Sequence, residues 1–361
     1  RRSLRWQRWS GQRATETMKA VVTGASGFLG GYLLEALAEE SGIEPIALVR
    51  EGSRTDRIDR LGVERRRADL SDPESLRQGL KGGEIVFHLA GRVSDWGSWR
   101  EFWKVNVEGT QRLLLAAAAE GVPRFVQVSS ISAYGMRIWR AEILTEECPY
   151  RACRLGRDFY CRSKHLAEEA VRKTCGEVGM EFVILRPGII VGERDSAVTR
   201  RIVSLIQGGE RILNVGPLDQ KIQFDHARDV ARGVVLAGLH FPANEAYNIA
   251  SPPKLSKLEL WSRVQKALKV DKEVREVPYH LAILWAALLE KAFLLRSDGS
   301  GPKYTVWSVY LMGNRNLIEG SKLSRLGWRP IEEPALAIEA AFAPYAEGPN
   351  RKGADEAWRV C

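Results

Sequence analysis

Three glycines at intervals of three residues follow directly after a short β-branched segment near the start of the chain. The segment Lys19–Thr23 predicts a β-strand, and residues 28–40 after the glycines have the apolar spacing of a helix. In such a turn the glycines permit a tight bend, close approach of a pyrophosphate, and close packing of helix on strand. The helix N-terminus then offers free amide groups and a positive dipole end to the phosphates. The residues predicted to bind a dinucleotide here are Gly24, Gly27, Phe28, Leu29 and Gly30.

Alternating strand and helix patterns continue from this unit to Pro187. Short apolar runs separated by longer stretches of helical periodicity indicate βαβ units and a parallel sheet that is covered on both faces. The expected fold class is therefore α/β, a Rossmann-type doubly wound parallel sheet. We predict further strands at 44–49, 63–67, 85–89, 125–129 and 182–185, and helices at 72–80, 99–120 and 158–178.

The pattern changes after Pro187, where the predicted strands become short and separated by helices. We interpret this part as a smaller C-terminal α/β lobe that binds the substrate and is partly interleaved with the sheet. The predicted division is a disordered basic extension at 1–17, a dinucleotide-binding domain at 18–186, a substrate-binding lobe at 187–346 and a flexible tail at 347–361.

The basic composition does not by itself indicate a nucleic-acid-binding protein. The formal net charge is +9; residues 1–17, with five arginines and one glutamate, supply +4, which leaves +5 for the rest. No basic run alternates with aromatic residues that could stack on bases, so we expect no nucleic-acid partner. Five cysteines without a C-x-x-C pair argue against a zinc site or a disulfide framework. We therefore expect no metal and a cytoplasmic location.

The richest apolar stretch runs from Leu281 to Leu289 and, after Glu290 and Lys291, continues from Ala292 to Leu295. It is shorter than the roughly 18–20 apolar residues that a membrane-spanning helix needs. Two interpretations remain open: a buried helix, or a helix that lies on a membrane surface or covers an apolar pocket.

The residue after the second predicted strand bears on the choice of cofactor. NAD-selective sites usually place an acidic residue there, to bind the ribose 2′-hydroxyl. This chain has Arg50, which could pair with a 2′-phosphate, so we predict NADP with NAD as the alternative. Ligands of such sheets bind outside the carboxyl ends of the strands. The residues that follow the third and fourth strands, and are predicted to contact the cofactor, are Asp69, Leu70, Leu89, Ala90 and Gly91.

A tyrosine and a lysine four residues apart lie on the predicted helix 158–178. That spacing places Tyr160 and Lys164 on one helix face, one turn apart. An ammonium group beside a phenol favours the phenolate, which would bring the Tyr160 pKa down from about 10 toward the range of acid–base catalysis. Ser130 follows the fifth strand and could orient a substrate oxygen. We predict Ser130, Tyr160 and Lys164 as the catalytic group, with Lys164 also binding the nicotinamide ribose.

Taken together, these motifs resemble the extended short-chain dehydrogenases/reductases, the family of NAD-dependent epimerases/dehydratases and 3β-hydroxysteroid dehydrogenases. The resemblance covers about residues 18–346. It implies that Ser130 assists Tyr160 and that the backbone around Pro187 and Ile190 borders the nicotinamide. The matching segments are TGASGFLG (23–30), ADLSD (68–72), FHLAG (87–91), NVEGT (106–110), VSSISAYG (128–135), YCRSK (160–164), LRPGIIVG (185–192) and YNI (247–249).

Several departures narrow the reaction that the resemblance implies. Sugar dehydratases of this family carry an Asp-Glu pair after the catalytic serine or threonine, where this chain has Ile131 and Ser132. The apolar and aromatic C-terminal segments, residues 280–295 and 307–312, suit a sterol or another bulky apolar hydroxy or keto compound, although a packed core helix would have the same composition. The closest branch is then the 3β-hydroxysteroid dehydrogenases, together with reductases of long-chain β-keto acids.

Two other classes stay open at this point. A sugar-nucleotide epimerase would use the same catalytic group without net redox change, and a cofactor-sensing protein would keep the glycine turn but need neither Tyr160 nor Lys164. Members of the family often dimerise through two long helices, here 99–120 and 158–178, so we expect a homodimer.

Overall fold

The computed structural model describes residues 17–195, 198–209, 211–296, 301–313, 315–331 and 333–346. The terminal segments predicted at 1–17 and 347–361 therefore lie outside the described residues, apart from Thr17. The described chain is built on a seven-stranded parallel sheet, with the strand order β3-β2-β1-β4-β5-β7-β12. Its strands are β1 Met18–Thr23, β2 Ile43–Val49, β3 Glu64–Arg67, β4 Ile85–His88, β5 Arg124–Val128, β7 Glu181–Pro187 and β12 Glu245–Ile249.

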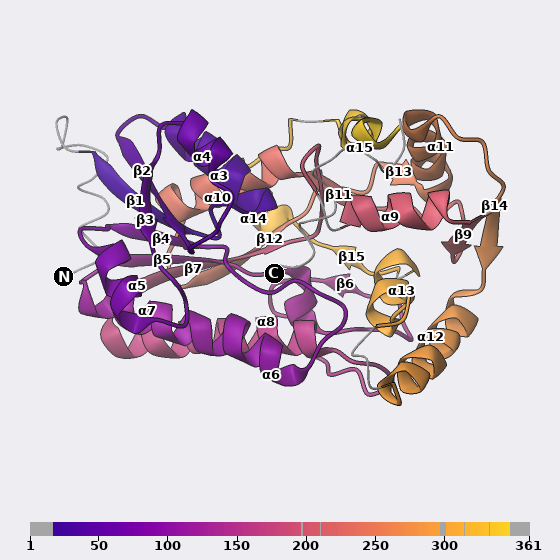
Figure 1. The fold of residues 1–361 in the computed structure, drawn as a ribbon, viewed down its shortest axis with the longest axis horizontal. Helices are drawn as coiled ribbons and strands as arrows, with labels where there is room; N and C mark the ends of the chain where they lie inside the picture. The colour runs from indigo at the N-terminus through magenta and orange to yellow at the C-terminus, as the bar shows by residue number, and fades with distance from the viewer. Residues whose placement is uncertain are drawn as a thin grey trace.

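Helices cover both faces of this sheet, as the alternating pattern predicts (Figure 1). The Rossmann-type α/β fold is thus confirmed. One face carries α3 Phe28–Ala38, α4 Asp56–Arg60, α10 Ala227–His240 and α14 Ser321–Arg325. The other face carries α5 Pro73–Leu80, α7 Gly109–Ala119 and α8 Phe159–Val178.

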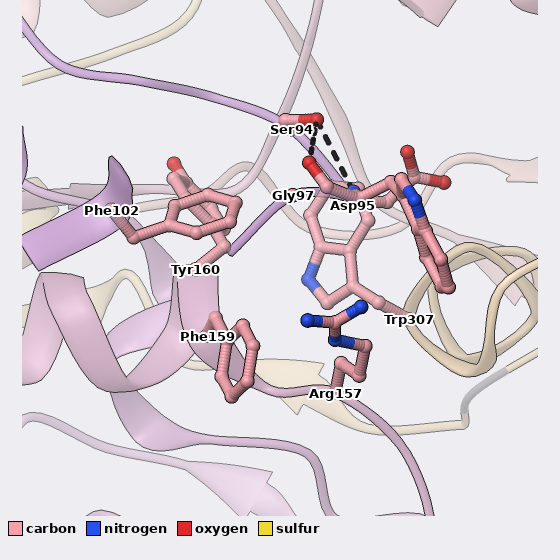
Figure 2. A pocket seen from close by; sticks show the side chains of 9 residues that line it. Ser94, Asp95, Gly97, Phe102, Arg157, Phe159, Tyr160 and Trp307 are labelled. Carbon is pink, nitrogen blue, oxygen red and sulfur yellow. Dashed lines mark hydrogen bonds between the residues drawn. The ribbon is translucent and has the colours of Figure 1, made fainter. Parts of the chain in front are cut away.

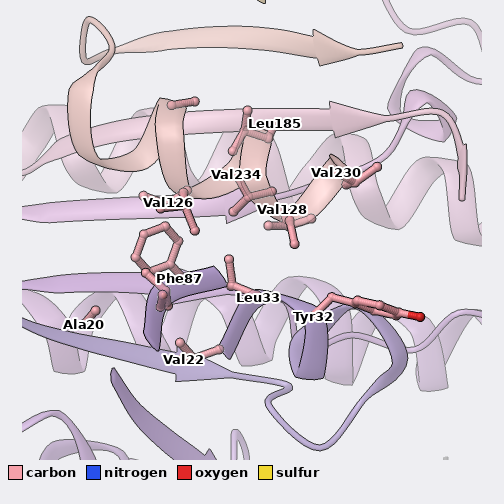
Figure 3. Close-up of a cluster of buried hydrophobic side chains, with 14 of the residues drawn as sticks. Ala20, Val22, Tyr32, Leu33, Phe87, Val126, Val128, Leu185, Val230 and Val234 are labelled. Carbon is pink, nitrogen blue, oxygen red and sulfur yellow. The ribbon is translucent and has the colours of Figure 1, made fainter. Parts of the chain in front are cut away.

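The core on the α3 side shows why the strands are so apolar. Val22, Phe87 and Val126 of three adjacent strands are fully buried and point toward Leu33 of α3 and Val234 of α10 (Figure 3). Strands that are buried on both faces gain transfer free energy on each side, about 25 cal/mol per Å² of apolar surface. This packing fixes the sheet, and with it the positions of the loops at its carboxyl edge.

The predicted helix 99–120 contains a local irregularity. It begins as α6 Trp99–Phe102, passes through a π-helical segment at Trp103–Glu108 and continues as α7. Ser98 and Glu101 form a capping box at its start, which satisfies two free backbone amides. Wider π turns occur often at functional sites, and this one carries Asn106, whose contacts are described below.

The remaining elements form a smaller lobe to the right of the sheet in Figure 1. It contains four two-stranded pairs: β8 Ile189–Val191 with β11 Phe224–His226, β9 Ile212–Val215 with β14 Val274–Val277, β10 Lys221–Ile222 with β13 Leu255–Ser256, and β6 Ile143–Leu144 with β15 Leu317–Ile318. Its helices are α9 Val198–Gln207, α11 Lys257–Leu268, α12 Tyr279–Leu294, α13 Val306–Gly313 and α15 Pro334–Phe342, and short 3₁₀ turns lie at Ile131–Tyr134 and Ala343–Tyr345.

Two elements predicted after Pro187 belong to the sheet layer rather than to the lobe. Strand β12 pairs with β7 at the sheet edge, and α10 packs against α3. A parallel edge strand requires a crossover connection, and α10 is the helix of that crossover. The interleaving of the two parts is consequently more extensive than the change of pattern after Pro187 indicates.

Helix α12 has one buried and one exposed face. Ile283 and Ala286 are fully buried, whereas Leu281, Trp285 and Leu288 are more than half exposed. The buried face agrees with the interpretation as a packed helix, and contact of the exposed face with a membrane surface or an apolar ligand stays a prediction. Among the described residues, no helix combines the length and apolarity needed to cross a membrane.

Candidate functional site

The predicted site residues follow the carboxyl ends of neighbouring strands. Because all seven strands run parallel, residues that directly follow them gather along one edge of the sheet. The structure therefore brings most of the residues chosen from the sequence into one region. By position they are Gly24 after β1, Arg50 after β2, Asp69 and Leu70 after β3, Leu89 to Gly91 after β4, Ser130 after β5, and Pro187 at the end of β7.

The glycine turn leaves no room for side chains. A β-carbon at Gly30 would lie 2.1 Å from the Gly24 carbonyl oxygen, and one at Gly24 would lie 2.7 Å from the Ala90 amide nitrogen. Gly24 also has a φ of +69°, which disfavours other residues. Gly27 caps α3 without a side-chain hydrogen bond, and the first turn of the helix holds no acidic residue. This cradle with free amides fits the diphosphate of a dinucleotide.

A buried chain of hydrogen bonds holds the neighbouring loop in place. His88 contacts Thr23 Oγ1 through Nδ1 at 2.7 Å and Thr110 Oγ1 through Nε2 at 2.9 Å. Burial lowers the pKa of His88 to about 3, so this imidazole stays neutral. Thr23 Oγ1 also accepts a hydrogen bond from the Ala90 amide. His88 is thus a structural link that sets the backbone of Leu89–Gly91 beside the glycine turn.

The two charged residues predicted to lie near the adenosine of the cofactor, Arg50 and Asp69, have opposite signs. Asp69 accepts hydrogen bonds from the amide and hydroxyl of Ser71 at 2.7 and 2.6 Å, which lowers its pKa, and the positive charge of Arg50 lowers it further. Arg50 itself is exposed at the end of β2. Leu70 packs against Gly109 at the start of α7. The residues predicted from the sequence therefore place one cation and one anion near each other at this edge.

Tyr160 and Lys164 lie one turn apart on α8, as predicted, and both are buried. Lys164 Nζ donates to the Val128 carbonyl at 3.2 Å, and burial lowers the pKa of Lys164 to about 8. Ser130 caps the 3₁₀ turn after β5, where its Oγ accepts the Ser132 amide. Hydrogen bonding between Ser130 and the Tyr160 hydroxyl favours the phenolate.

The expected lowering of the Tyr160 pKa by Lys164 is not found in this structure. Burial dominates and raises the pKa of Tyr160, and the hydrogen bond with Ser130 only partly opposes that rise. The physical reason is that removing a phenolate from water costs more than one neighbouring hydroxyl returns. Tyr160 is therefore neutral, which leaves it able to donate a proton.

A set of buried polar residues supports this group, and the sequence motifs contain them without revealing their role. Asn106, on the π-helical segment, donates to Ser163 Oγ at 2.8 Å, and Ser163 Oγ donates to the Tyr160 carbonyl at 2.8 Å. Asn106 also accepts the Arg92 amide at 2.7 Å and donates to the Arg92 carbonyl. The loop after β4 is thereby tied to the helix that carries Tyr160.

A second buried cluster joins β5, which directly precedes Ser129 and Ser130, and its neighbour β7 to α8. Glu168 accepts a hydrogen bond from Ser129 Oγ at 2.6 Å and forms a buried ion pair with Arg186 of β7 at 2.6 Å. Both charged side chains are at most 9% exposed, so each buried charge is balanced by the other. The cluster holds β5, β7 and α8 in register beneath the catalytic group.

An aromatic pocket lies beside Tyr160 (Figure 2). Trp307 of α13 meets the Tyr160 ring edge to face, with 5.6 Å between centroids. The predicted apolar segment 307–312 thus contributes one wall. The other walls are formed by residues that are not among the predicted site residues, namely Ser94 to Gly97, Phe102, Arg157 and Phe159.

Ile190 and Phe28 both pack against the core beneath the glycine turn. Strand β8, which contains Ile190, leads directly to Gly192, where a β-carbon would lie 3.2 Å from the Phe28 ring. Strand β8, which contains Ile190 and is predicted to border the nicotinamide, therefore ends close to Phe28 of the glycine turn.

Comparisons with known proteins agree with this geometry. A family model described as "NAD dependent epimerase/dehydratase family" matches residues 20–250. The 2-alkyl-3-oxoalkanoate reductase of Stenotrophomonas maltophilia (strain K279a) is 29% identical over 295 residues, which cover 79% of this chain and 86% of that protein. The mouse (Mus musculus) "Sterol-4-alpha-carboxylate 3-dehydrogenase, decarboxylating" is 26% identical over 343 residues, 92% of each chain.

Solved structures extend the likeness at the level of the fold. The crystal structure of UDP-glucuronic acid 4-epimerase from Bacillus cereus in complex with NAD matches with a TM-score of 0.69 and 21% identity, over 91% of this chain and 99% of that chain. At this identity the match concerns the architecture alone.

Proposed function

This chain belongs to the NAD-dependent epimerase/dehydratase family, and we propose that it interconverts a secondary alcohol and a ketone on a bulky apolar substrate. The observation that carries this proposal is the aromatic pocket beside Tyr160. Its walls include Phe102, Phe159 and Trp307, which offer broad apolar surfaces next to a proton donor. A nucleotide diphosphate would instead call for several cations at this position.

The roles of the three catalytic residues follow from their positions. When bound, the nicotinamide supplies or accepts a hydride at the carbon that carries the substrate oxygen. Tyr160 gives a proton to that oxygen during reduction and takes it back during oxidation. Ser130 holds the same oxygen through its hydroxyl. Lys164, buried one turn along α8, would bind the ribose.

The cofactor would lie along the carboxyl edge of the sheet. The glycine turn and the N-terminus of α3 would hold the diphosphate, and Leu89 to Gly91 would border the chain between the two nucleosides. We propose NADP as the preferred form, because Arg50 offers a cation where a 2′-phosphate would lie.

The substrates named for two relatives point to a common chemical core. A 2-alkyl-3-oxoalkanoate carries its oxo group two carbons from the carboxylate carbon. A sterol-4-alpha-carboxylate that is dehydrogenated at position 3 has the same relation between acid and oxygen. In both names the carbon between acid and ketone carries a bulky apolar group. We propose a substrate of this class for the present protein.

A turnover screen tests the proposal. The purified protein would be assayed with NADP⁺ and NADPH against sterols, 2-alkyl-3-hydroxy and 3-keto acids and sugar nucleotides, followed at the absorbance of reduced nicotinamide. Net redox turnover of an apolar alcohol or ketone is the expected result. Interconversion of a sugar nucleotide without net change of cofactor would establish an epimerase and overturn the proposal.

We also propose a homodimer formed by the helices α6–α7 and α8. Leu115 on α7 and Val178 at the end of α8 are 61% and 44% exposed, so apolar surface is available on both helices. A mass measurement in dilute solution would give twice the mass of the chain; the mass of one chain would contradict it.

A further inference from the structure

The pocket beside Tyr160 contains a cation that the catalytic mechanism does not use. Arg157 lies three residues before Tyr160, and both side chains line the pocket (Figure 2). We propose that Arg157 is a specificity-determining residue that binds a carboxylate on the substrate, adjacent to the carbon that bears the reacting oxygen. This inference rests on the proposed function and names the residue that would select its acidic substrates.

The guanidinium of Arg157 lies over aromatic rings, and its charge interacts with those of Glu101 and Glu290 without an ion pair among the described residues. It lies 4.7 Å from the centroid of Trp96 and 4.8 Å from that of Phe159. Within the described part of the chain, this guanidinium makes no hydrogen bond or ion pair. Other arginines around the site are engaged: Arg92 pairs with Glu101, and Arg186 with Glu168. Arg157 therefore keeps its N–H donors available in a half-buried position.

The backbone of Arg157 is fixed by a buried carboxylate. Glu290 of α12, only 3% exposed, accepts the Arg157 amide at 3.1 Å and the Val306 amide at 2.8 Å. One acid thus anchors the two segments that bring Arg157 and Trp307 to the pocket. Glu290 therefore positions Arg157 through its backbone amide, and its charge also attracts the guanidinium, although the two side chains form no ion pair in the described structure.

The acidic side chains around the pocket accept hydrogen bonds from other groups and leave the N–H donors of Arg157 available. Asp95 accepts a hydrogen bond from Thr305 Oγ1 at 3.0 Å, and Glu101 is engaged by the Ser98 amide at 2.6 Å in the capping box of α6. A planar guanidinium stacked between rings has lost much of its rotational freedom before the ligand arrives. It can then meet a carboxylate with two parallel N–H···O bonds at low entropic cost.

The geometry also orders the substrate. Its acid would lie against Arg157, its oxygen against Tyr160 and Ser130, and its apolar group against the ring faces of Phe102 and Trp307. A neutral alcohol of the same shape would leave a half-buried cation unpaired, so it would be a poorer substrate.

The test compares an acid with its neutral derivative. Substrates are a 2-alkyl-3-hydroxyalkanoate and its methyl ester, and the variants are Arg157→Gln, Arg157→Lys and the control Arg162→Gln. Arg162 stacks on Trp99 at 4.6 Å and does not line the pocket, so its loss removes a comparable cation–π contact only. Cofactor binding and the melting temperature of each variant report whether the fold is kept.

We expect Arg157→Gln to lower kcat/KM for the acid about 10- to 100-fold, the worth of one or two charge-assisted hydrogen bonds, and to leave the ester nearly unchanged. Arg157→Lys should recover part of this loss, and Arg162→Gln should resemble wild type. Quenching of tryptophan fluorescence by the acid, with Trp96 and Trp307 in the pocket, should weaken in parallel.

Equal losses on acid and ester, or no loss on either, would overturn the role of Arg157 while the proposed redox function stands. Wild-type protein that binds cofactor and turns over neither compound would instead overturn both.

Discussion

The glycine turn and the aromatic pocket beside Tyr160 are built in opposite ways. The turn is made by seven consecutive residues, and its shape comes from the absence of side chains: β-carbons at Gly24 and Gly30 would meet backbone atoms at 2.7 and 2.1 Å. The pocket is made by side chains from three separate segments, around residues 94–102, 157–160 and 307.

The two regions therefore differ in the substitutions that they can tolerate. Backbone atoms in the turn cannot move away from an added methyl group without displacing β1, α3 or the loop after β4. In the pocket, rings and a guanidinium stack on one another, and such contacts can adjust to substrates of different shape. We expect the cofactor turn to be intolerant of change and the pocket to carry substrate selectivity.

Tyr160→Phe should have the largest effect, because Tyr160 is the proposed proton donor. Removal of one positioned acid–base group typically lowers turnover about 10²- to 10⁴-fold. The affinity for cofactor should remain close to that of wild type, since the ring is kept. Steady-state turnover and cofactor titration measure the two quantities; full activity in the variant would refute the assigned mechanism.

Gly30→Ala should have the next largest effect, a loss of cofactor affinity that arises in the glycine turn. The added carbon would meet the Gly24 carbonyl oxygen, so the turn and the start of α3 must shift. We expect cofactor affinity to fall roughly 10- to 100-fold, as one or two charge-assisted hydrogen bonds to phosphate are lost. Isothermal titration with NADPH measures it.

Gly42→Ala is the matched control for this prediction. Gly42 has a positive φ, +79°, which Gly30 does not have, and nothing lies within 4 Å of its added β-carbon. That variant should lose some stability to backbone strain and keep its cofactor affinity. Equal losses of affinity in both variants would show that the cradle depends on general stability and not on the close contacts at Gly30.

Arg50→Asp tests the cofactor preference at the exposed end of β2. We expect wild type to bind NADPH more tightly than NADH, and the variant to lose roughly tenfold in NADPH affinity, the worth of one charge-assisted hydrogen bond. NADH affinity should change little. Titration of both cofactors into both proteins decides it, and a wild type that prefers NADH would contradict the role of Arg50.

Lys164 gives the smallest expected effect, a pH dependence of stability. Burial lowers its pKa to about 8 in the folded chain, against an ordinary value of 10.5. Between these values Lys164 binds more protons in the unfolded chain than in the folded chain. Its contribution therefore increases the free energy of unfolding as the pH rises from 8 to 10.5. Below pH 8 its destabilising effect is complete.

The free energy of unfolding of wild type, relative to Lys164→Met, should therefore increase across that window in urea titrations. Lys257, whose pKa burial also lowers to about 8, is present in both proteins and cancels in the difference. A flat difference would show that Lys164 has its ordinary pKa, and that its contact with the Val128 carbonyl does not confine it to a dry environment.

Much of the sheet could be predicted because its pattern is local. Strands β1, β2, β4, β5 and β7 are found within a few residues of their predicted bounds, since apolar β-branched runs between helical stretches have few other structures available. The edge strand β12 was grouped with the lobe. Its short run indicates a strand but not its partner, and pairing with β7 is decided only when α10 crosses back over the sheet.

By itself, the sequence determined the cofactor turn and the pairing of Tyr160 with Lys164. Both depend on spacing within one element: three glycines at a strand end, and four residues on a helix. Only the tertiary structure decided that burial raises the Tyr160 pKa, that Glu168 and Arg186 support Ser129, and that Arg157 faces the pocket. These properties depend on which distant side chains exclude water, and no local spacing encodes that.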